Sequence, residues 1–296
     1  MIIMYPTTTP EKMVKLGPYD LTVAMDANIS AGIYPLVLIS HGSGGAPLAY
    51  RTLAHYLACH GFIVALPQHP FNHRNDNSRE GTVDNLQDRP KHIRLAIDWL
   101  FESDQFKTGL QPNSVALIGH SMGGYTALAV AGGMPRSLPA ESSDGQFHPI
   151  PVTPDERIKA LVLLAPASVW FQADGALRKI NCPILMLVGE KDEFTGPACP
   201  VLLAHEEKNK FIRYGYHVHL ILDGLPKDAD VQHRLVKNAG HFSFLSPFPE
   251  VMKNTKFLPS QDPKGFNRES FQHELHAEVL SFLLHRLPKV VPSVIN

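Results

Sequence analysis

The residue best placed to do chemistry in this chain is Ser121, at the centre of the sequence Gly-His-Ser-Met-Gly formed by residues 119–123. A short apolar run, residues 114–118, leads into this motif, and a helical pattern begins at Tyr125. A strand that turns this tightly into a helix leaves no room for a Cβ atom two positions before or after the serine, so glycine is needed there. The pattern predicts a serine hydroxyl at the carboxyl end of a strand, presented as a nucleophile to a carbonyl carbon.

Such a nucleophile needs a base, and the base needs a carboxylate that orients it. On a doubly wound sheet the acid follows the serine in the chain and precedes the histidine. Asp192 fits this role, because it comes directly after the apolar run 183–188 and therefore lies at the carboxyl end of a buried strand. Glu190 and Glu193, in the same turn, are the alternatives, and a solvated surface turn is the structural alternative.

The general base is predicted to be His241, in the sequence Gly-His-Phe that follows the last expected strand. A histidine behind a glycine in a tight turn, with aromatic neighbours that exclude water, suits proton transfer. His41, His69 and His233 are the competing candidates.

Acyl transfer also needs N–H donors for the oxyanion of the tetrahedral intermediate, each worth roughly 2.7–4 kcal/mol of the barrier. The residue after the nucleophile, Met122, is expected to supply one. The second is expected from the glycine-rich sequence 41–45, where Ser43 is the first choice and Gly44 the next. His41 is interpreted as a residue that braces this loop.

The elements that must position these residues follow from apolar runs that alternate with helical patterns. They predict an α/β fold: a doubly wound, mostly parallel sheet with helices on both faces. A helix is expected to begin near Pro90, since proline is tolerated in a first turn. The expected strands are residues 34–40, 62–66, 114–118, 158–164 and 183–188, and the expected helices are residues 50–60, 90–103 and 269–287.

Other segments are less clearly patterned. Residues 19–27 alternate as an antiparallel strand would, and residues 217–222 fit a strand or a helix, with helix favoured before a last strand at 231–236. We expect one domain over residues 1–296, with loop excursions near 67–88, 132–157 and 246–267. Prolines crowd the last two excursions, as expected of loops over the carboxyl edge of the sheet or of plain surface loops.

Composition excludes several classes of function. The formal net charge is −1, from 27 basic and 28 acidic residues, which gives no electrostatic footprint for nucleic acid or anionic membranes. Three cysteines without metal-ligand spacing indicate reduced thiols.

No apolar run reaches membrane-spanning length, and the cytoplasm is the expected location, although a secreted form with its signal peptide removed would look the same. No cofactor motif or metal-ligand pattern is found, and the oligomeric state cannot be read from the sequence.

Taken together, these motifs resemble the α/β-hydrolase superfamily, and within it the dienelactone-hydrolase-like proteins that are related to platelet-activating-factor acetylhydrolases. The resemblance runs from about Tyr34 to Leu287. It implies hydrolysis of a carboxylic ester or related acyl compound through an acyl-serine, without metal or organic cofactor. The sequences that carry it are residues 38–45, 57–65, 119–124, 183–189 and 240–245.

Two departures limit what the resemblance implies. Dienelactone hydrolases proper use a cysteine where this chain has Ser121, so their lactone substrate is not carried over. The acetylhydrolases carry their acid one strand earlier, where residues 163–168 of this chain contain no carboxylate. The acid must then be Asp192, with Asp174 as the fallback.

The leading hypothesis is a serine esterase that acts on a small-molecule acyl ester. An amide or peptide hydrolase on the same residues, an acyltransferase and a catalytically silent binding module are the alternatives. Aromatic residues that fit an apolar acyl pocket, or equally the core, are Phe71, Phe147, Trp170 and Phe171.

Overall fold

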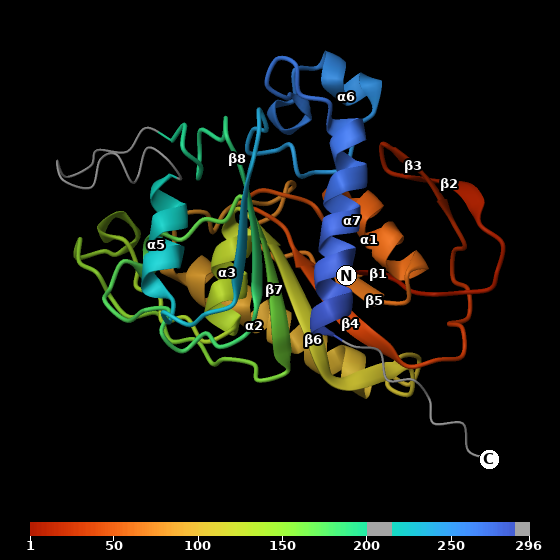
Figure 1. Ribbon diagram of the computed structural model, residues 1–296, viewed down its shortest axis with the longest axis horizontal. Coiled ribbons are helices and arrows are strands. Elements are labelled where there is room, and N and C mark those ends of the chain that lie inside the picture. Colours follow the sequence, from red (N-terminus) through yellow and green to blue (C-terminus); the bar gives the residue numbers. More distant parts are fainter. Residues whose placement is uncertain (200–214, 288–296) are drawn as a thin grey trace.

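A seven-stranded sheet forms the centre of the computed structural model, which describes residues 1–199 and 215–287 (Figure 1). Its strand order is β1-β5-β4-β6-β7-β8-β9. The six strands from β5 to β9 in this order are parallel, and β1 runs antiparallel to β5 at the edge. The strands are β1 Ile2–Met4, β4 Tyr34–Ser40, β5 Ile63–Leu66, β6 Leu110–His120, β7 Ile158–Leu164, β8 Ile184–Gly189 and β9 Val231–Val236. The predicted α/β fold with a mostly parallel sheet is confirmed.

Helices cover both faces of this sheet (Figure 1). Alternate strand residues belong to two separate apolar cores: Leu36 and Leu38 of β4 to one, Val37 and Ile39 to the other. Burial on both faces explains why these strands are continuously apolar. The helices α1 Arg51–Cys59 and α7 Arg268–Arg286 pack on one face, and α2 Val83–Glu102, α3 Met122–Val130 and α5 Tyr216–Gly224 pack on the other.

The start of α2 differs from the prediction. The helix begins at Val83, where the Thr82 side chain caps it by accepting from the N–H of Asn85, so Pro90 lies inside the helix. Proline has no N–H for the Leu86 carbonyl, which would leave that buried oxygen without its helical partner. The Tyr125 hydroxyl from α3 donates to it at 2.8 Å. A tertiary contact therefore makes the interior proline tolerable.

The structure shows which secondary structure the less clearly patterned segments adopt. Residues 217–222 are helical, within α5, and β9 begins and ends at the predicted residues. The alternating segment forms β3 Tyr19–Val23, which pairs with β2 Lys12–Leu16 in a separate two-stranded sheet. The remaining short elements are α6 Glu250–Asn254 and the 3-10 helices η1 Pro47–Tyr50, η2 Pro139–Glu141, η3 Val169–Phe171 and η4 Leu258–Ser260.

The two proline-rich excursions lie in different places. Residues 246–267 supply side chains to the cavity beside Ser121, at the carboxyl edge of the sheet. Residues 132–157 leave the end of α3 and enter the start of β7, and Asp155 N–H donates to the Val130 carbonyl there. Both ends of this excursion therefore lie at the amino edge, because α3 runs antiparallel to the strand before it. Of the two alternatives for this excursion, a plain surface loop fits and a loop over the carboxyl edge does not.

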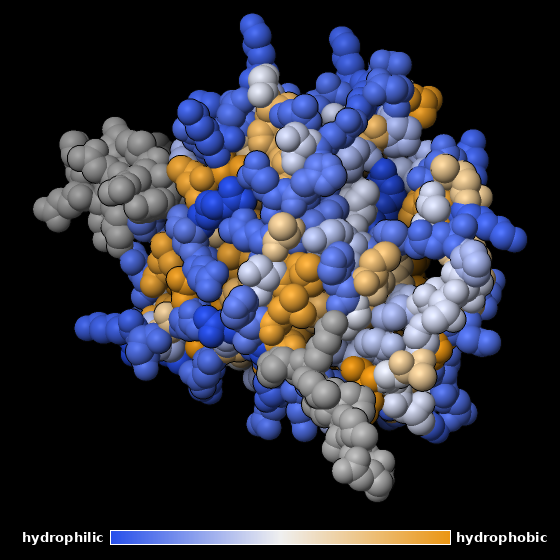
Figure 2. All heavy atoms as spheres, turned by 45° about the vertical axis from the view of Figure 1, so that its right-hand side comes forward, coloured by the Kyte–Doolittle hydropathy of each residue, from blue (hydrophilic) through white to orange (hydrophobic). Residues whose placement is uncertain are grey.

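Hydrophilic side chains predominate on the face seen in Figure 2, where they separate the apolar patches from one another. Among residues 1–199 and 215–287, every helix is too short or too polar to cross a bilayer.

The hydroxyl that compensates for Pro90 can be tested. Replacing Tyr125 by Phe leaves the buried Leu86 carbonyl without a donor, and we expect the free energy of unfolding to fall by about 1–3 kcal/mol. Urea denaturation followed by circular dichroism measures this change. Tyr56→Phe is the matched control, because no hydrogen bond of the Tyr56 hydroxyl is found in the described part of the chain. Equal stability of the two variants would contradict the explanation.

Candidate active site

The turn between β6 and α3 has the strained geometry expected of a nucleophile elbow. Ser121 has φ 55° and ψ −119°, a conformation that costs a residue with a side chain on the order of 1–3 kcal/mol. A Cβ on Gly119 would lie 2.2 Å from the Gly123 carbonyl oxygen, and one on Gly123 only 1.9 Å from that of Ser40. Both glycines are therefore required, as predicted, and the second is crowded by the neighbouring strand β4.

The turn after β8 holds a buried carboxylate. Asp192 is 0% exposed, and its Oδ1 accepts the N–H groups of Phe194 (2.8 Å) and Thr195 (2.9 Å). The Thr195 hydroxyl donates to Oδ2 at 2.8 Å. Thr195 was not predicted from the sequence; its signal is an aspartate followed three residues later by a threonine, as in side-chain-to-backbone turns.

His241 completes the shell of this carboxylate. Its Nδ1 lies 3.0 Å from each oxygen of Asp192, and its side chain is 4% exposed. Burial by itself would raise the pKa of Asp192, but the hydrogen bond and charge of His241, together with the Thr195 donors, lower it to about 2. Because a carboxylate accepts, Nδ1 carries the proton and Nε2 is left as the basic nitrogen.

Hydrogen bonds between the turns after β8 and β9 fix this pairing. The N–H of Lys191 donates to Ala239 at 2.8 Å, and the Glu190 carboxylate accepts from the N–H of Asn238 at 2.9 Å. Glu190 thus shapes the histidine turn and does not contact the imidazole. The other two alternatives lie elsewhere: Glu193 is exposed, and Asp174 pairs with Arg178 at the surface.

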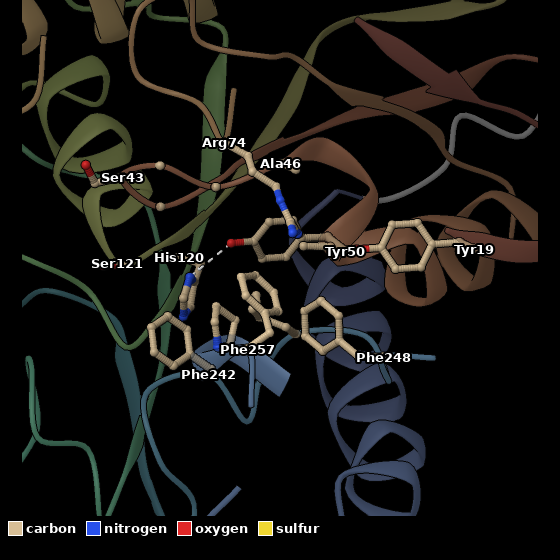
Figure 3. Close-up of a pocket in the computed structure, with 16 residues that line it drawn as sticks. Tyr19, Ser43, Ala46, Tyr50, Arg74, His120, Ser121, Phe242, Phe248 and Phe257 are labelled. Atoms are coloured by element: carbon tan, nitrogen blue, oxygen red, sulfur yellow. Dashed lines mark hydrogen bonds between the residues drawn. The ribbon is translucent and has the colours of Figure 1, made fainter. Parts of the chain in front are cut away.

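His120, the residue before Ser121, holds the turn that carries His241. Its Nε2 lies 2.9 Å from the His241 carbonyl oxygen, which can only accept, so Nε2 carries the proton. Nδ1 then accepts from the Tyr50 hydroxyl at 3.0 Å, drawn as the dashed line in Figure 3. Burial and the charge of His241 lower the pKa of His120 to about 3, so this imidazole stays neutral.

The loop after β4 lies against Ser121. A Cβ on Gly42 would be 3.1 Å from that of Ser121. In the described part of the chain no carbonyl accepts from the N–H of Ser43 or Met122, the two predicted oxyanion donors. The Ser43 side chain points away from the cavity (Figure 3) and donates to Glu80 at 2.8 Å. Its contribution to an oxyanion hole would therefore come from its backbone.

His41 braces this loop, as interpreted from the sequence. The His69 N–H donates to its Nε2 at 3.2 Å, so Nδ1 carries the proton and donates to the Gly42 carbonyl at 2.8 Å. Burial and the nearby Arg89 charge lower its pKa to about 3. His69 is buried against Ser40, and His233 lies inside β9, away from its carboxyl end. Each is therefore unsuited to act as the base.

A cavity of about 80 Å³ opens beside Ser121 (Figure 3). The aromatic residues that fitted either an acyl pocket or the core do not line it: Trp170 and Phe171 pack on Tyr125, and arginines cover the exposed rings of Phe71 and Phe147. Its aromatic lining comes instead from five residues brought together by the fold, Tyr19, Tyr50, Phe242, Phe248 and Phe257. Sequence reasoning missed them because they come from segments far apart in the chain.

The fold brings the predicted site residues to one edge of the sheet. Ser121, Asp192 and His241 each follow the carboxyl end of a parallel strand. Among the described residues no hydrogen bond joins the Ser121 hydroxyl to a side chain, and the bond to His241 stays a prediction. Catalytic hydrogen bonds often tighten only when substrate is bound.

Comparisons with known proteins agree with this architecture. The family model for chlorophyllase matches residues 7–140, a stretch that contains Ser121 and ends before Asp192. Platelet-activating factor acetylhydrolase from Bos taurus is 25% identical over 156 residues, covering 38% of this chain and 35% of that protein. Chlorophyllase-1 from Arabidopsis thaliana is 26% identical over 217 residues, covering 66% of this chain and 62% of that protein.

A solved structure matches over more of the chain. The ferulic acid esterase from Streptomyces cinnamoneus has a TM-score of 0.61 at 18% identity, covering 92% of this chain and 73% of that one. This chain therefore has the α/β-hydrolase fold. The predicted likeness of this chain to platelet-activating-factor acetylhydrolases is confirmed, although it spans only about a third of the bovine protein.

One group of side chains in the described part of the chain has the composition of a metal site. Glu11, His55 and Cys59 lie close together at the surface, where Nε2 of His55 bonds Glu11 at 2.7 Å. None of the three lines the cavity beside Ser121.

The depressed pKa of Asp192 predicts a pH-dependent contribution to stability. The folded pKa of about 2 lies below that of an unfolded aspartate, about 3.9, so the ionised carboxylate stabilises the fold above about pH 4. This contribution, on the order of 2 kcal/mol, is lost as the pH falls toward 2. Asp192→Asn should therefore lower the free energy of unfolding at pH 6 and matter less at pH 3. Glu193→Gln, at an exposed carboxylate, should show no such trend, and a pH-independent difference for Asp192→Asn would contradict the assignment.

Proposed function

We propose that this α/β-hydrolase cleaves carboxylic esters through a covalent acyl intermediate on Ser121. The observation that carries the proposal is the buried hydrogen bond of 3.0 Å between His241 and Asp192, at the same sheet edge as the strained serine. The pair leaves a basic nitrogen facing outward from the carboxylate, as a proton acceptor requires. Relatives named as acetylhydrolase and chlorophyllase support an ester as the substrate.

The reaction follows from these roles. His241 Nε2 takes the proton of Ser121 as Oγ attacks the ester carbonyl carbon, and the Asp192 carboxylate stabilises the resulting imidazolium. The N–H groups of Ser43 and Met122 bind the oxyanion. His241 then returns the proton to the departing alcohol. Water, activated by the same imidazole, releases the acid and restores the serine.

Removing the nucleophile is the direct test. Ser121→Ala should lower kcat for p-nitrophenyl acetate by about 10⁶-fold, the scale seen when a triad serine is removed. It should also abolish labelling by a fluorophosphonate probe. Ser143→Ala, at an exposed serine in the 132–157 excursion, is the control and should behave as the unmodified protein. Hydrolysis and labelling that persist in Ser121→Ala would sink the proposal.

The cavity predicts short acyl groups. At about 80 Å³ it is smaller than the ~150 Å³ cavity that accommodates benzene in a protein core, so acetate and butyrate esters should have a higher kcat/KM than octanoate. Phe257→Ala removes a wall of the cavity and should raise the octanoate-to-acetate ratio of kcat/KM by about tenfold. A series of p-nitrophenyl esters measures both effects. Octanoate as the preferred substrate of the unmodified protein would refute the size argument.

A further inference from the structure

Arg89 of α2 is a buried charge for which the proposed reaction has given no role. Its side chain is 0% exposed, and within residues 1–199 and 215–287 no carboxylate pairs with the guanidinium. Burial lowers its pKa to about 9, which still leaves it protonated at neutral pH. A charge held this way is unfavourable unless its donors are satisfied. Here neutral oxygen atoms from three different segments satisfy them.

The first of these contacts is with the loop after β4. Nη2 of Arg89 donates to the His41 carbonyl and lies 3.3 Å from the Ser40 hydroxyl. The His41 carbonyl belongs to the peptide group just before Gly42 and Ser43. The guanidinium therefore fixes the orientation of the backbone that leads to the first proposed oxyanion donor.

A second contact reaches the side chain of the same donor residue. Nη1 of Arg89 donates to the Asn72 amide oxygen at 2.5 Å, and the Asn72 amide nitrogen donates to the Ser43 hydroxyl at 3.0 Å. That hydroxyl donates onward to Glu80 at 2.8 Å. These three consecutive hydrogen bonds all run from donor to acceptor in the direction from Arg89 to Glu80. Hydrogen bonds aligned in this way polarise and strengthen one another.

The third contact reaches the other donor. Nε of Arg89 donates to the Thr126 hydroxyl at 2.9 Å, and this hydroxyl donates to the Met122 carbonyl at 3.0 Å. One planar group thus contacts both segments that carry the proposed oxyanion donors. A lysine would replace it only in part, because its single nitrogen cannot reach all the acceptors that Nε, Nη1 and Nη2 contact from separate positions.

We propose that Arg89 is a positioning residue for the oxyanion hole, holding the Ser43 and Met122 segments in register and adding an unneutralised positive charge beneath them. This inference rests on the proposed function. Arg89 should stabilise the transition state, in which the carbonyl oxygen becomes an anion, and should leave the binding of the neutral ester unchanged.

The test compares Arg89→Gln and Arg89→Lys, each confirmed as folded by a cooperative unfolding transition. Arg89→Gln should lower kcat for p-nitrophenyl acetate by about 100-fold with KM within about threefold, and Arg89→Lys should recover only part of the loss. A trifluoromethyl ketone, whose adduct with Ser121 carries an oxyanion, should bind Arg89→Gln about 100-fold more weakly, whereas the matched amide should bind unchanged.

A purely structural role predicts a different result. Arg157→Gln is the matched control, because Arg157 pairs with Asp98 and Asp155 at the amino edge; it should lower stability without changing kcat. If Arg89→Gln behaves like this control, with unchanged kcat and ketone affinity, the inference is wrong.

Misfolding of Arg89→Gln and failure of the proposed function would each give a distinct result. Should Arg89→Gln not fold, Thr126→Val removes only the link to Met122, and it should still lower kcat and ketone affinity together by about tenfold. Unchanged values in that variant would overturn the inference. If the unmodified protein hydrolyses no ester, the proposed function fails and takes this inference with it, whereas ester hydrolysis that is insensitive to Arg89 leaves the function intact.

Discussion

The hydrogen bond between His241 and Asp192 is the interaction on which the rest of the site depends. A carboxylate with no exposed surface remains ionised only where donors surround it, and His241 and Thr195 supply them. The bond is possible because β8 and β9 are parallel neighbours, so the turns that follow them meet at one edge. Hydrogen bonds between those turns hold the two residues together, and the carboxylate keeps the imidazole in the tautomer that is protonated at Nδ1.

Neutral histidines elsewhere in the site act as rigid braces. His41 and His120 are both buried, and in each a carbonyl acceptor decides which ring nitrogen carries the proton. Because burial lowers the pKa of both far below neutrality, their hydrogen bonds keep the same direction across the physiological pH range. A chain rich in histidine thus uses several of them for geometry, which their number alone does not reveal.

Much of the fold was predictable because its signals are local. Apolar runs buried on both faces predict the parallel strands, and the glycines around Ser121 predict the elbow, since a tight turn excludes Cβ atoms whatever surrounds it. The start of α2 was not predictable in this way. Local rules tolerate proline in the first turn of a helix and not in its interior, so Pro90 predicted a helix start. Its place inside α2 depends on the Tyr125 hydroxyl, which belongs to another helix.

The sequence by itself determined the order and type of the candidate site residues: a serine between glycines, then Asp192 and His241, each after an apolar run. Only the tertiary structure decided which aromatic residues line the cavity and how a buried Arg89 is satisfied. The physical reason is how far apart in the sequence the interacting residues lie. Backbone conformation is governed by neighbours in the chain, whereas burial and the pairing of polar groups depend on segments that meet only after folding.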